Sequence, residues 1–194
     1  MRARTMAALA LLAFGAGAEV LAQDPPGTAS RLTINGGSTL RSWSCSTANV
    51  QGRVSGQGSS IAELAAGTHQ VALTIPVASI DCRNGTMNGH LRRALRAQRQ
   101  PEIRFELDSY EVDAAGQVQA EGQLSVGGRT TPVRLSATVV PAPAGLRASG
   151  RVALRMTELG VEPPSLMLGT LKVHDRITIE FDVYLAQGQL VAAR

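Results

Sequence analysis

The sequence predicts an all-β protein with about eight amphipathic strands and a single helix. Most of the chain after residue 30 alternates apolar and polar residues, which is the pattern of half-buried strands. Turns rich in glycine and proline separate the alternating segments, and only one segment has helical periodicity. Strands with one apolar face bury it in a closed antiparallel barrel or in a two-layer sandwich, and the barrel also removes exposed edges.

Residues 1–22 have the layout of a secretory signal peptide. Two arginines precede an uninterrupted apolar run over residues 6–14, and small residues follow up to Ala22. The run is too short for a membrane anchor, since spanning a bilayer takes about 18 or more apolar residues. We therefore expect a periplasmic or secreted protein without stable membrane insertion. We expect it to have a disordered linker over 23–30, one barrel domain over 31–187 and a flexible tail over 188–194.

Alternating segments supply the inward-facing rows of the predicted strands. In DRITIEFDVYL, residues 175–185, apolar side chains occupy every second position, with charged or polar ones between them. The same period recurs in four earlier segments, so that each strand has one apolar face. We expect the interior, and any ligand pocket in it, to be lined by these rows: Leu73, Ile75 and Val77; Ile103 and Phe105; Val133 and Leu135; Val152 and Leu154; Ile177, Ile179 and Phe181.

Other segments give weaker or more local signals. Residues 32–35 and about 40–55 are weaker strand candidates. Pro76 has no amide donor, which favours an edge position or a bulge for its strand. Gly127-Gly128 lies between two alternating runs and predicts a hairpin, because paired glycines tolerate positive φ.

The one predicted helix covers about residues 84–98. Met87, Leu91 and Leu95 recur every four residues and form a narrow apolar stripe. Asn84 or Thr86 can act as the N-cap, and Pro101 prevents the helix from continuing. Such a helix would flank or plug one end of a barrel.

The chain has two cysteines, Cys45 and Cys82. In an oxidising compartment the simplest interpretation is a disulfide between them. It would connect an early strand to the corner before the helix. A metal-binding pair or a reactive thiol is the alternative, although neither cysteine lies in a C-x-x-C or C-x-x-H arrangement.

The residues indicate no catalytic or cofactor chemistry, so we expect a protein that is not an enzyme. The three histidines lie in different segments without metal-ligand spacing, and no glycine-rich loop links a strand to a helix. Aromatic residues make up only 3% of the chain, which disfavours base stacking and hence nucleic-acid binding. The net charge of +4 is by itself too small to identify a nucleic-acid or membrane partner.

Five segments resemble motifs of the YceI-like family, and they follow one another in the same order as in that family. They are VALTIPVASIDC at 71–82, HLRRAL at 90–95, QPEIRF at 100–105, GQLSVGGRTTPVRLSATV at 122–139 and VHDRITIEFDV at 173–183. The resemblance implies an exported, eight-stranded lipocalin-like antiparallel barrel that holds a long isoprenoid chain and performs no chemistry. Where many members carry Arg-x-Asp-Phe-Gly, this chain has Met156–Gly160, so ligand contacts at those positions do not transfer.

Two alternatives stay open for the interior. Leu, Ile and Val rows suit a long-chain amphiphile or an isoprenoid lipid, but the same side chains can also fill a small barrel. A filled barrel would fit an envelope stress or protein-interaction module. His90, Arg92 and Arg93 are candidates for an anionic head group or form a solvated helix face. The segment 159–172 is a candidate lid or packs on the outer helix, and the oligomeric state, possibly a dimer, is open.

Overall fold

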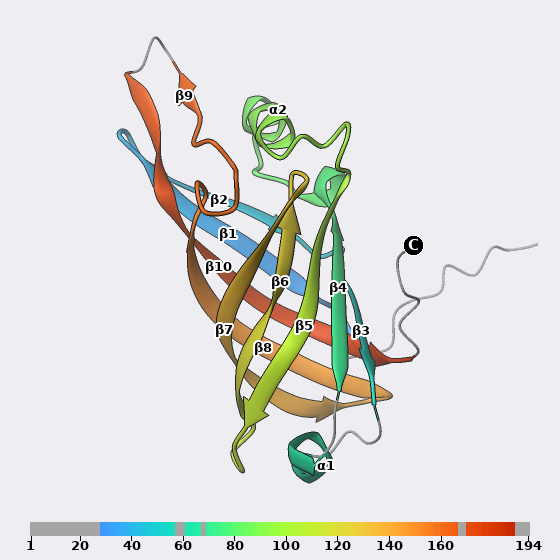
Figure 1. Ribbon diagram of the computed structural model, residues 1–194. Coiled ribbons are helices and arrows are strands. Elements are labelled where there is room, and N and C mark those ends of the chain that lie inside the picture. Colours follow the sequence, from blue (N-terminus) through green and yellow to red (C-terminus); the bar gives the residue numbers. More distant parts are fainter. Residues whose placement is uncertain (1–27, 57–60, 67–68, 167–169, 189–194) are drawn as a thin grey trace, which may run out of the picture.

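The computed structural model describes residues 28–56, 61–66, 69–166 and 170–188. The predicted signal peptide, most of the linker and most of the tail lie outside these residues. One ten-stranded sheet curls around an interior, with α2 at one end and α1 at the other (Figure 1). The strands are β1 (Arg31–Ser38), β2 (Ser42–Thr47), β3 (Gln51–Ser55), β4 (Gln70–Pro76), β5 (Glu102–Val112), β6 (Gln117–Val126), β7 (Arg129–Ala142), β8 (Gly145–Arg155), β9 (Ser165–Leu166) and β10 (Leu171–Gln187).

The predicted barrel is confirmed, although its closed circuit has seven strands and not eight. From β3 to β8 each strand pairs with the next, and the long strand β10 joins β8 to β3. β1 and β2 form an additional hairpin on β10. Because β1 is antiparallel to both β2 and β10, these two run in the same direction. β3 follows β2 in the same direction. Past Asp182, the last partner of β1 on β10, β3 takes the place of β1 and pairs with β10 in parallel, with Leu185 opposite Gly52.

The hairpin is also fastened on its outer edge. The predicted disulfide Cys45–Cys82 is present and links β2 to the corner that precedes α2. Next to it, the backbone groups of Ser46 and Asp81 exchange two N–H···O bonds of 2.9 Å. At the α2 end, the barrel wall is therefore continued from β2 to the corner before α2 by a disulfide and a short β-bridge, and not by a continuous strand pairing.

The predicted helix is present as α2 (Gly85–Ala94), which ends four residues earlier than expected. Asn84 is the N-cap, and its Oδ1 accepts a 3.0 Å bond from the amide of Met87. Arg96 adopts a φ of 52°, in the left-handed region, so the helix cannot continue to Pro101. The predicted hairpin at Gly127-Gly128 is confirmed, since both glycines have positive φ between β6 and β7.

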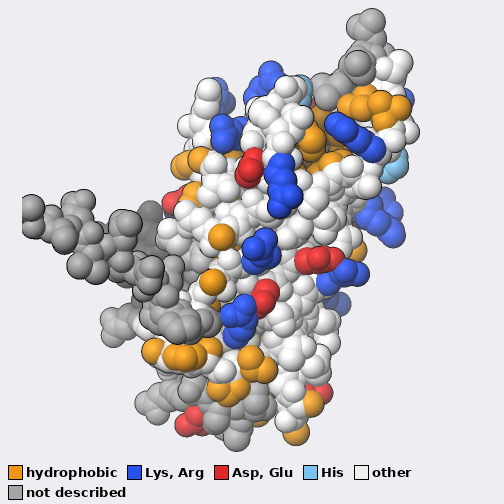
Figure 2. Space-filling model, turned by 180° about the vertical axis from the view of Figure 1, so that it is seen from behind, with side chains coloured by type: hydrophobic (Ala, Val, Ile, Leu, Met, Phe, Trp, Pro, Cys, Tyr) orange, Lys and Arg blue, Asp and Glu red, His pale blue; other side chains and the backbone are white. Residues whose placement is uncertain are grey.

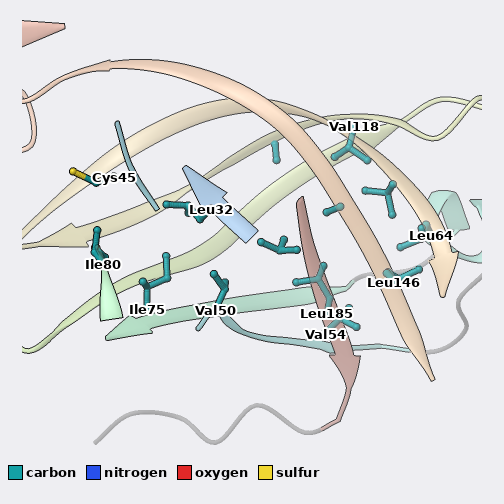
Figure 3. Packing of buried hydrophobic residues seen from close by; sticks show 14 of the residues in the cluster. Leu32, Cys45, Val50, Val54, Leu64, Ile75, Ile80, Val118, Leu146 and Leu185 are labelled. Atoms are coloured by element: carbon teal, nitrogen blue, oxygen red, sulfur yellow. The ribbon is translucent and has the colours of Figure 1, made fainter. Parts of the chain in front are cut away.

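Pro76 lies at the end of β4, beyond the last β3 partner at Thr74, and pairs only with Glu102 of β5, so its position is locally an edge. It is followed by η1 (Val77–Ser79), a single 3₁₀ turn. Val77 therefore leaves the alternating row of its strand and is 1% exposed beneath the α2 corner. Figure 3 shows side chains from β1, β4 and β8, among them Leu32, Ile75 and Leu146, gathered in one interior.

Across the described residues, no helix has the length and apolar character needed to cross a membrane.

Candidate functional site

The barrel interior is hollow and contains two adjacent chambers that share part of their lining. The chamber next to α1 (Ile61–Ala66), the lower chamber, has a volume of about 160 Å³. The chamber beneath α2, the upper chamber, has a volume of about 420 Å³. Five side chains line both chambers and form a waist between them: Leu32, Ile75, Ile103, Leu124 and Ile179.

The lower chamber is lined almost wholly by aliphatic side chains. Of the predicted rows, ten residues line it: Leu73, Ile75, Ile103, Phe105, Val133, Leu135, Val152, Leu154, Ile179 and Phe181. The rings of Phe105 and Phe181 lie close to Gly122 and Gly150, where a Cβ atom would come within 2.6 and 2.7 Å of the respective ring. These glycines therefore leave room in the wall for the rings. A dry apolar cavity of roughly 150 Å³ can hold a small hydrocarbon.

The polar groups of the lower chamber are at its floor. His69 is 6% exposed, and its Nδ1 atom lies 3.0 Å from the hydroxyl oxygen of Tyr110. That hydroxyl donates a 2.8 Å bond to the carbonyl of Leu64 in α1. Burial raises the pKa of Tyr110, with an opposing contribution from His69. The pair ties β5 to α1 and gives the floor a hydrogen-bonded polar group beneath an apolar space.

The upper chamber is formed by the β1–β2 hairpin, α2 and the segment after β8. The α2 stripe of Met87, Leu91 and Leu95 faces it, confirming the predicted apolar face of the helix. Trp43, the only tryptophan of the chain, also lines it and donates a hydrogen bond to the carbonyl of Gly37. Of the predicted interior residues, Ile177 lines the upper chamber but not the lower one, and Val77 lines neither chamber.

The segment that follows β8 contributes to the wall of the upper chamber. Leu159 and Val161 are each 5% exposed, and both line the chamber together with Pro164. Asp175 holds the start of this segment, since its carboxylate accepts bonds of 2.9 Å from the amide and the hydroxyl of Thr157. These bonds, the amide bond first, lower the pKa of Asp175. Residues 167–169, part of the predicted lid, lie outside the described residues.

Polar side chains lie at the outer rim of the upper chamber. They are Ser38, Arg41, Asn84, Thr86 and His90. A guanidinium and an imidazole on opposite sides of an apolar chamber are suited to an anionic or strongly polar head group.

Of the three predicted head-group residues, only His90 lines the chamber. The guanidinium of Arg93 donates to Nδ1 of His90 at 3.0 Å, which leaves the proton of a neutral imidazole on Nε2. Arg92 reaches the carbonyl of Ala78 at 3.4 Å. Arg92 and Arg93 are exposed and lie outside the lining of the chamber.

A family model described as the YceI-like domain matches residues 28–185. The chain belongs to the YceI-like domain family. No curated protein matches it.

Solved structures of YceI-like and related proteins have the same fold. BcnA of Burkholderia cenocepacia has a TM-score of 0.66 at 19% identity, covering 79% of this chain and 94% of BcnA. The YceI protein of Campylobacter jejuni has a TM-score of 0.55 at 19% identity, covering 73% and 86% of the two chains. A polyisoprenoid binding domain from Saccharophagus degradans has a TM-score of 0.59 at 14% identity, covering 82% and 95%. At these identities the likeness shows the fold.

Sequence reasoning missed several residues of the site in this YceI-like protein. Leu64, His69 and Tyr110 at the floor come from a short helix and two strand ends, and no local pattern brings them together. Trp43 and Arg41 lie in the weakly patterned segment 40–55. A lone tryptophan and one of only two tyrosines, in a chain so poor in aromatic residues, were the available signals.

The described residues provide no group of three or more His, Cys, Asp or Glu side chains that could hold a metal ion. Hydrogen bonds within the fold explain why the pKa values of some acidic groups are lowered. Asp81 accepts bonds from the side chain of Asn88 and the amide of Arg83, and these lower its pKa. The chambers thus combine an apolar interior with polar groups at the rim and the floor.

Proposed function

We propose that this YceI-like protein is an exported binding protein that holds a long-chain apolar or isoprenoid-like lipid inside its barrel. The observation that carries the proposal is the pair of adjacent apolar chambers that share the five side chains of the waist, with the polar side chains of the described lining at the outer rim and the floor. This arrangement matches the chemistry of an amphiphile whose tail passes the waist and whose head stays at the rim beside α2.

The energetics favour a flexible aliphatic tail over a planar ring system. Each methylene group removed from water contributes about 0.8 kcal/mol. The lining offers Leu, Ile and Val side chains in contact with the tail, and few aromatic surfaces for stacking. The upper chamber, at about 420 Å³, lies within the range of roughly 300–1,000 Å³ that is usual for small-molecule sites.

Family membership and one neighbour support an isoprenoid. The Saccharophagus degradans structure is described as a polyisoprenoid binding domain, and this chain has the same fold. A branched isoprenoid tail presents methyl groups along its length, which suits a wall of branched aliphatic side chains.

Export is part of the proposal. The basic and apolar layout of residues 1–22 supports a cleaved leader. The disulfide Cys45–Cys82 supports an oxidising compartment such as the periplasm or the medium. A non-enzymatic role agrees with the apolar lining, since the rim residues are suited to binding a head group.

The alternative of a filled barrel that acts only as a stress or interaction module requires side chains that mesh across the interior. The two chambers argue against it.

The direct test is mass spectrometry of an organic extract of the protein purified without detergent from its exporting host. We expect a stoichiometric long-chain lipid in the extract, and a much smaller amount from a variant whose waist is filled, Leu124→Trp. An extract without lipid, from a folded protein that also binds no long-chain lipid added afterwards, would refute the proposal.

A further inference from the structure

The charges of this protein are divided between the two ends of the barrel. We define the mouth end as residues 38–42, 77–104, 126–130, 155–166 and 170–176, which lie at the α2 end of the barrel, next to the upper chamber. It carries eleven basic and five acidic residues. The rest of the described chain carries five basic and eight acidic residues. The modest net charge of the whole chain therefore conceals a cationic end and an acidic end.

The basic residues of the mouth end come from several sides of the opening. Arg41 lies in the β1–β2 turn, Lys172 at the start of β10 and Arg129 at the β6–β7 turn. Five more lie on α2 and the segments beside it: Arg83, Arg92, Arg93, Arg96 and Arg99. All eight of these side chains are exposed. Figure 2 shows basic side chains over the upper and middle parts of the face drawn, whereas its lower end shows acidic but no basic side chains.

Most of the positive charge at the mouth end is not neutralised locally. Within the described residues, ion pairs hold only two of its basic side chains, Arg104 with Glu102 and Arg155 with Glu158. Two of its acidic residues accept hydrogen bonds within this end, Asp81 from Arg83 and Asn88 and Asp175 from Thr157. The mouth end thus presents a surplus of cations to whatever approaches it.

An apolar side chain lies among these cations. Leu40, at the tip of the β1–β2 turn, is 72% exposed and directly precedes Arg41. The turn is held in place, since the Ser38 hydroxyl donates to the carbonyl of Arg41 and the Thr39 amide donates to the carbonyl of Lys172. A rigid turn with one exposed leucine between basic residues is suited to the interfacial region of an anionic bilayer.

We propose that the mouth end docks on the surface of an anionic phospholipid bilayer, so that the upper chamber opens toward the lipid. A docking partner for this surplus of basic residues must be anionic. An acidic protein surface would meet that single condition as well as a membrane would. The exposed Leu40 and the apolar chamber beside the basic residues of the mouth end favour a bilayer over a protein. This choice of partner rests on the proposed lipid-binding function. The acidic end would then point away from the membrane, which orients the barrel.

The strength of docking follows from the number of charges. Each basic residue close to an anionic membrane increases the affinity about fivefold. Screening limits the attraction to about 10 Å at 0.1 M salt, so only residues near the surface contribute. Removing three cations of the mouth end should therefore weaken binding about a hundredfold, while removing three from elsewhere should have little effect.

The test is co-sedimentation of the full mature protein with phosphatidylcholine vesicles that contain or lack phosphatidylglycerol. The mouth variant is Arg83→Gln, Arg99→Gln and Lys172→Gln, which avoids every side chain that lines a chamber. The control is Arg31→Gln, Arg53→Gln and Arg134→Gln, which changes the net charge equally at exposed positions outside the mouth end. A third variant, Leu40→Ser, removes the apolar tip. Circular dichroism confirms that each variant is folded.

We expect binding to the anionic vesicles only, weakened by added salt and by Leu40→Ser, lost in the mouth variant and retained in the control. Absence of vesicle binding, equal binding to both vesicle types, or equal loss in both triple variants would overturn the docking proposal. Lipid extracted from the same preparations keeps the two proposals separate. A protein that contains lipid but does not bind vesicles refutes docking alone. One that binds vesicles but neither contains lipid nor takes up long-chain lipid added afterwards refutes the lipid-binding function.

Discussion

Cys45 and Cys82 join the outer edge of the β1–β2 hairpin to the corner that precedes α2, and both line the upper chamber. The link lies where the barrel lacks a continuous strand pairing. It therefore connects the hairpin that carries Trp43 and Arg41 to the helix that carries His90. Two walls of the candidate site are held together by this bond and by the adjacent Ser46–Asp81 bridge.

Removing the disulfide should destabilise the protein without abolishing the fold. The bond closes a loop with a sequence separation of 37 residues, for which chain entropy predicts a stabilisation of about 3–4 kcal/mol. We expect the variant Cys45→Ala/Cys82→Ala to lose about this much free energy of unfolding in urea titration. Hydrogen exchange should increase most in α2 and β2. An unchanged midpoint for the double variant would contradict the role assigned to the bond.

The floor of the lower chamber should make stability depend on pH in the alkaline range. Burial raises the pKa of Tyr110 in the folded protein, so the folded state holds this proton more tightly than the unfolded state does. The resulting stabilisation is complete below the pKa of an unfolded tyrosine, about 10, and is lost as the pH rises through the folded value.

The variant Tyr110→Phe tests this directly. It should lose about 1–3 kcal/mol near neutral pH, because the carbonyl of Leu64 and the imidazole of His69 lose a partner. Its free energy of unfolding should then fall less steeply than that of the wild type above pH 10. Tyr184→Phe is the matched control at the barrel exterior, and parallel pH profiles for wild type and Tyr110→Phe would contradict the assignment.

The waist should determine how long a ligand tail can be. Leu124 lines both chambers, so Leu124→Trp should block entry to the lower chamber while leaving the upper chamber accessible. In calorimetry, straight-chain carboxylates with short chains should bind the variant as they bind the wild type. Once the chain fills the upper chamber, each further methylene should bring no gain in affinity. Gln123→Trp, at the neighbouring position of β6 that lines neither chamber, is the control. Normal binding of long chains by Leu124→Trp would show that the tail does not pass the waist.

The rim should distinguish charged from neutral head groups. Arg41 and His90 line the upper chamber, whereas Arg92 donates to a backbone carbonyl outside it. We expect Arg41→Gln or His90→Gln to weaken binding of a long-chain carboxylate about three- to fivefold, since a partly exposed ion pair with Arg41, or a hydrogen bond from Nε2 of His90, contributes ~1 kcal/mol or less. The alcohol of equal length should be unaffected, and so should both ligands in Arg92→Gln. Equal effects on acid and alcohol would remove the electrostatic role.

The sequence predicted most of the wall and the helix at one end of the barrel, but not the floor at the other end. Alternation is a local property, so the rows containing Phe105 or Ile179 could be assigned to the interior without knowing which strands pair. The parallel pairing of β10 with β3 depends on where β1 begins, and no short segment contains that information. The row from Leu73 was extended too far, because Pro76 ends the ladder and Val77 enters a 3₁₀ turn.

The two ends of the cavity depend on contacts between distant residues. His69 and Tyr110 meet because β4 begins and β5 ends at the same end of the barrel. The helix stripe of Met87 and Leu91 was predictable from its period. Whether Arg92 or His90 faces the chamber depends on how α2 is rotated on the barrel, which is decided by packing and not by helical spacing alone.

The central claim, an interior open to a long apolar chain, is tested most directly by affinity as a function of chain length. Trp43 lines the upper chamber, so its fluorescence reports binding of straight-chain carboxylates of increasing length to delipidated wild-type protein. We predict that affinity rises about fourfold with each methylene, from about 0.8 kcal/mol per group, until the tail fills the lower chamber, and then levels off. An affinity independent of chain length, or no binding at any length, would contradict the claim.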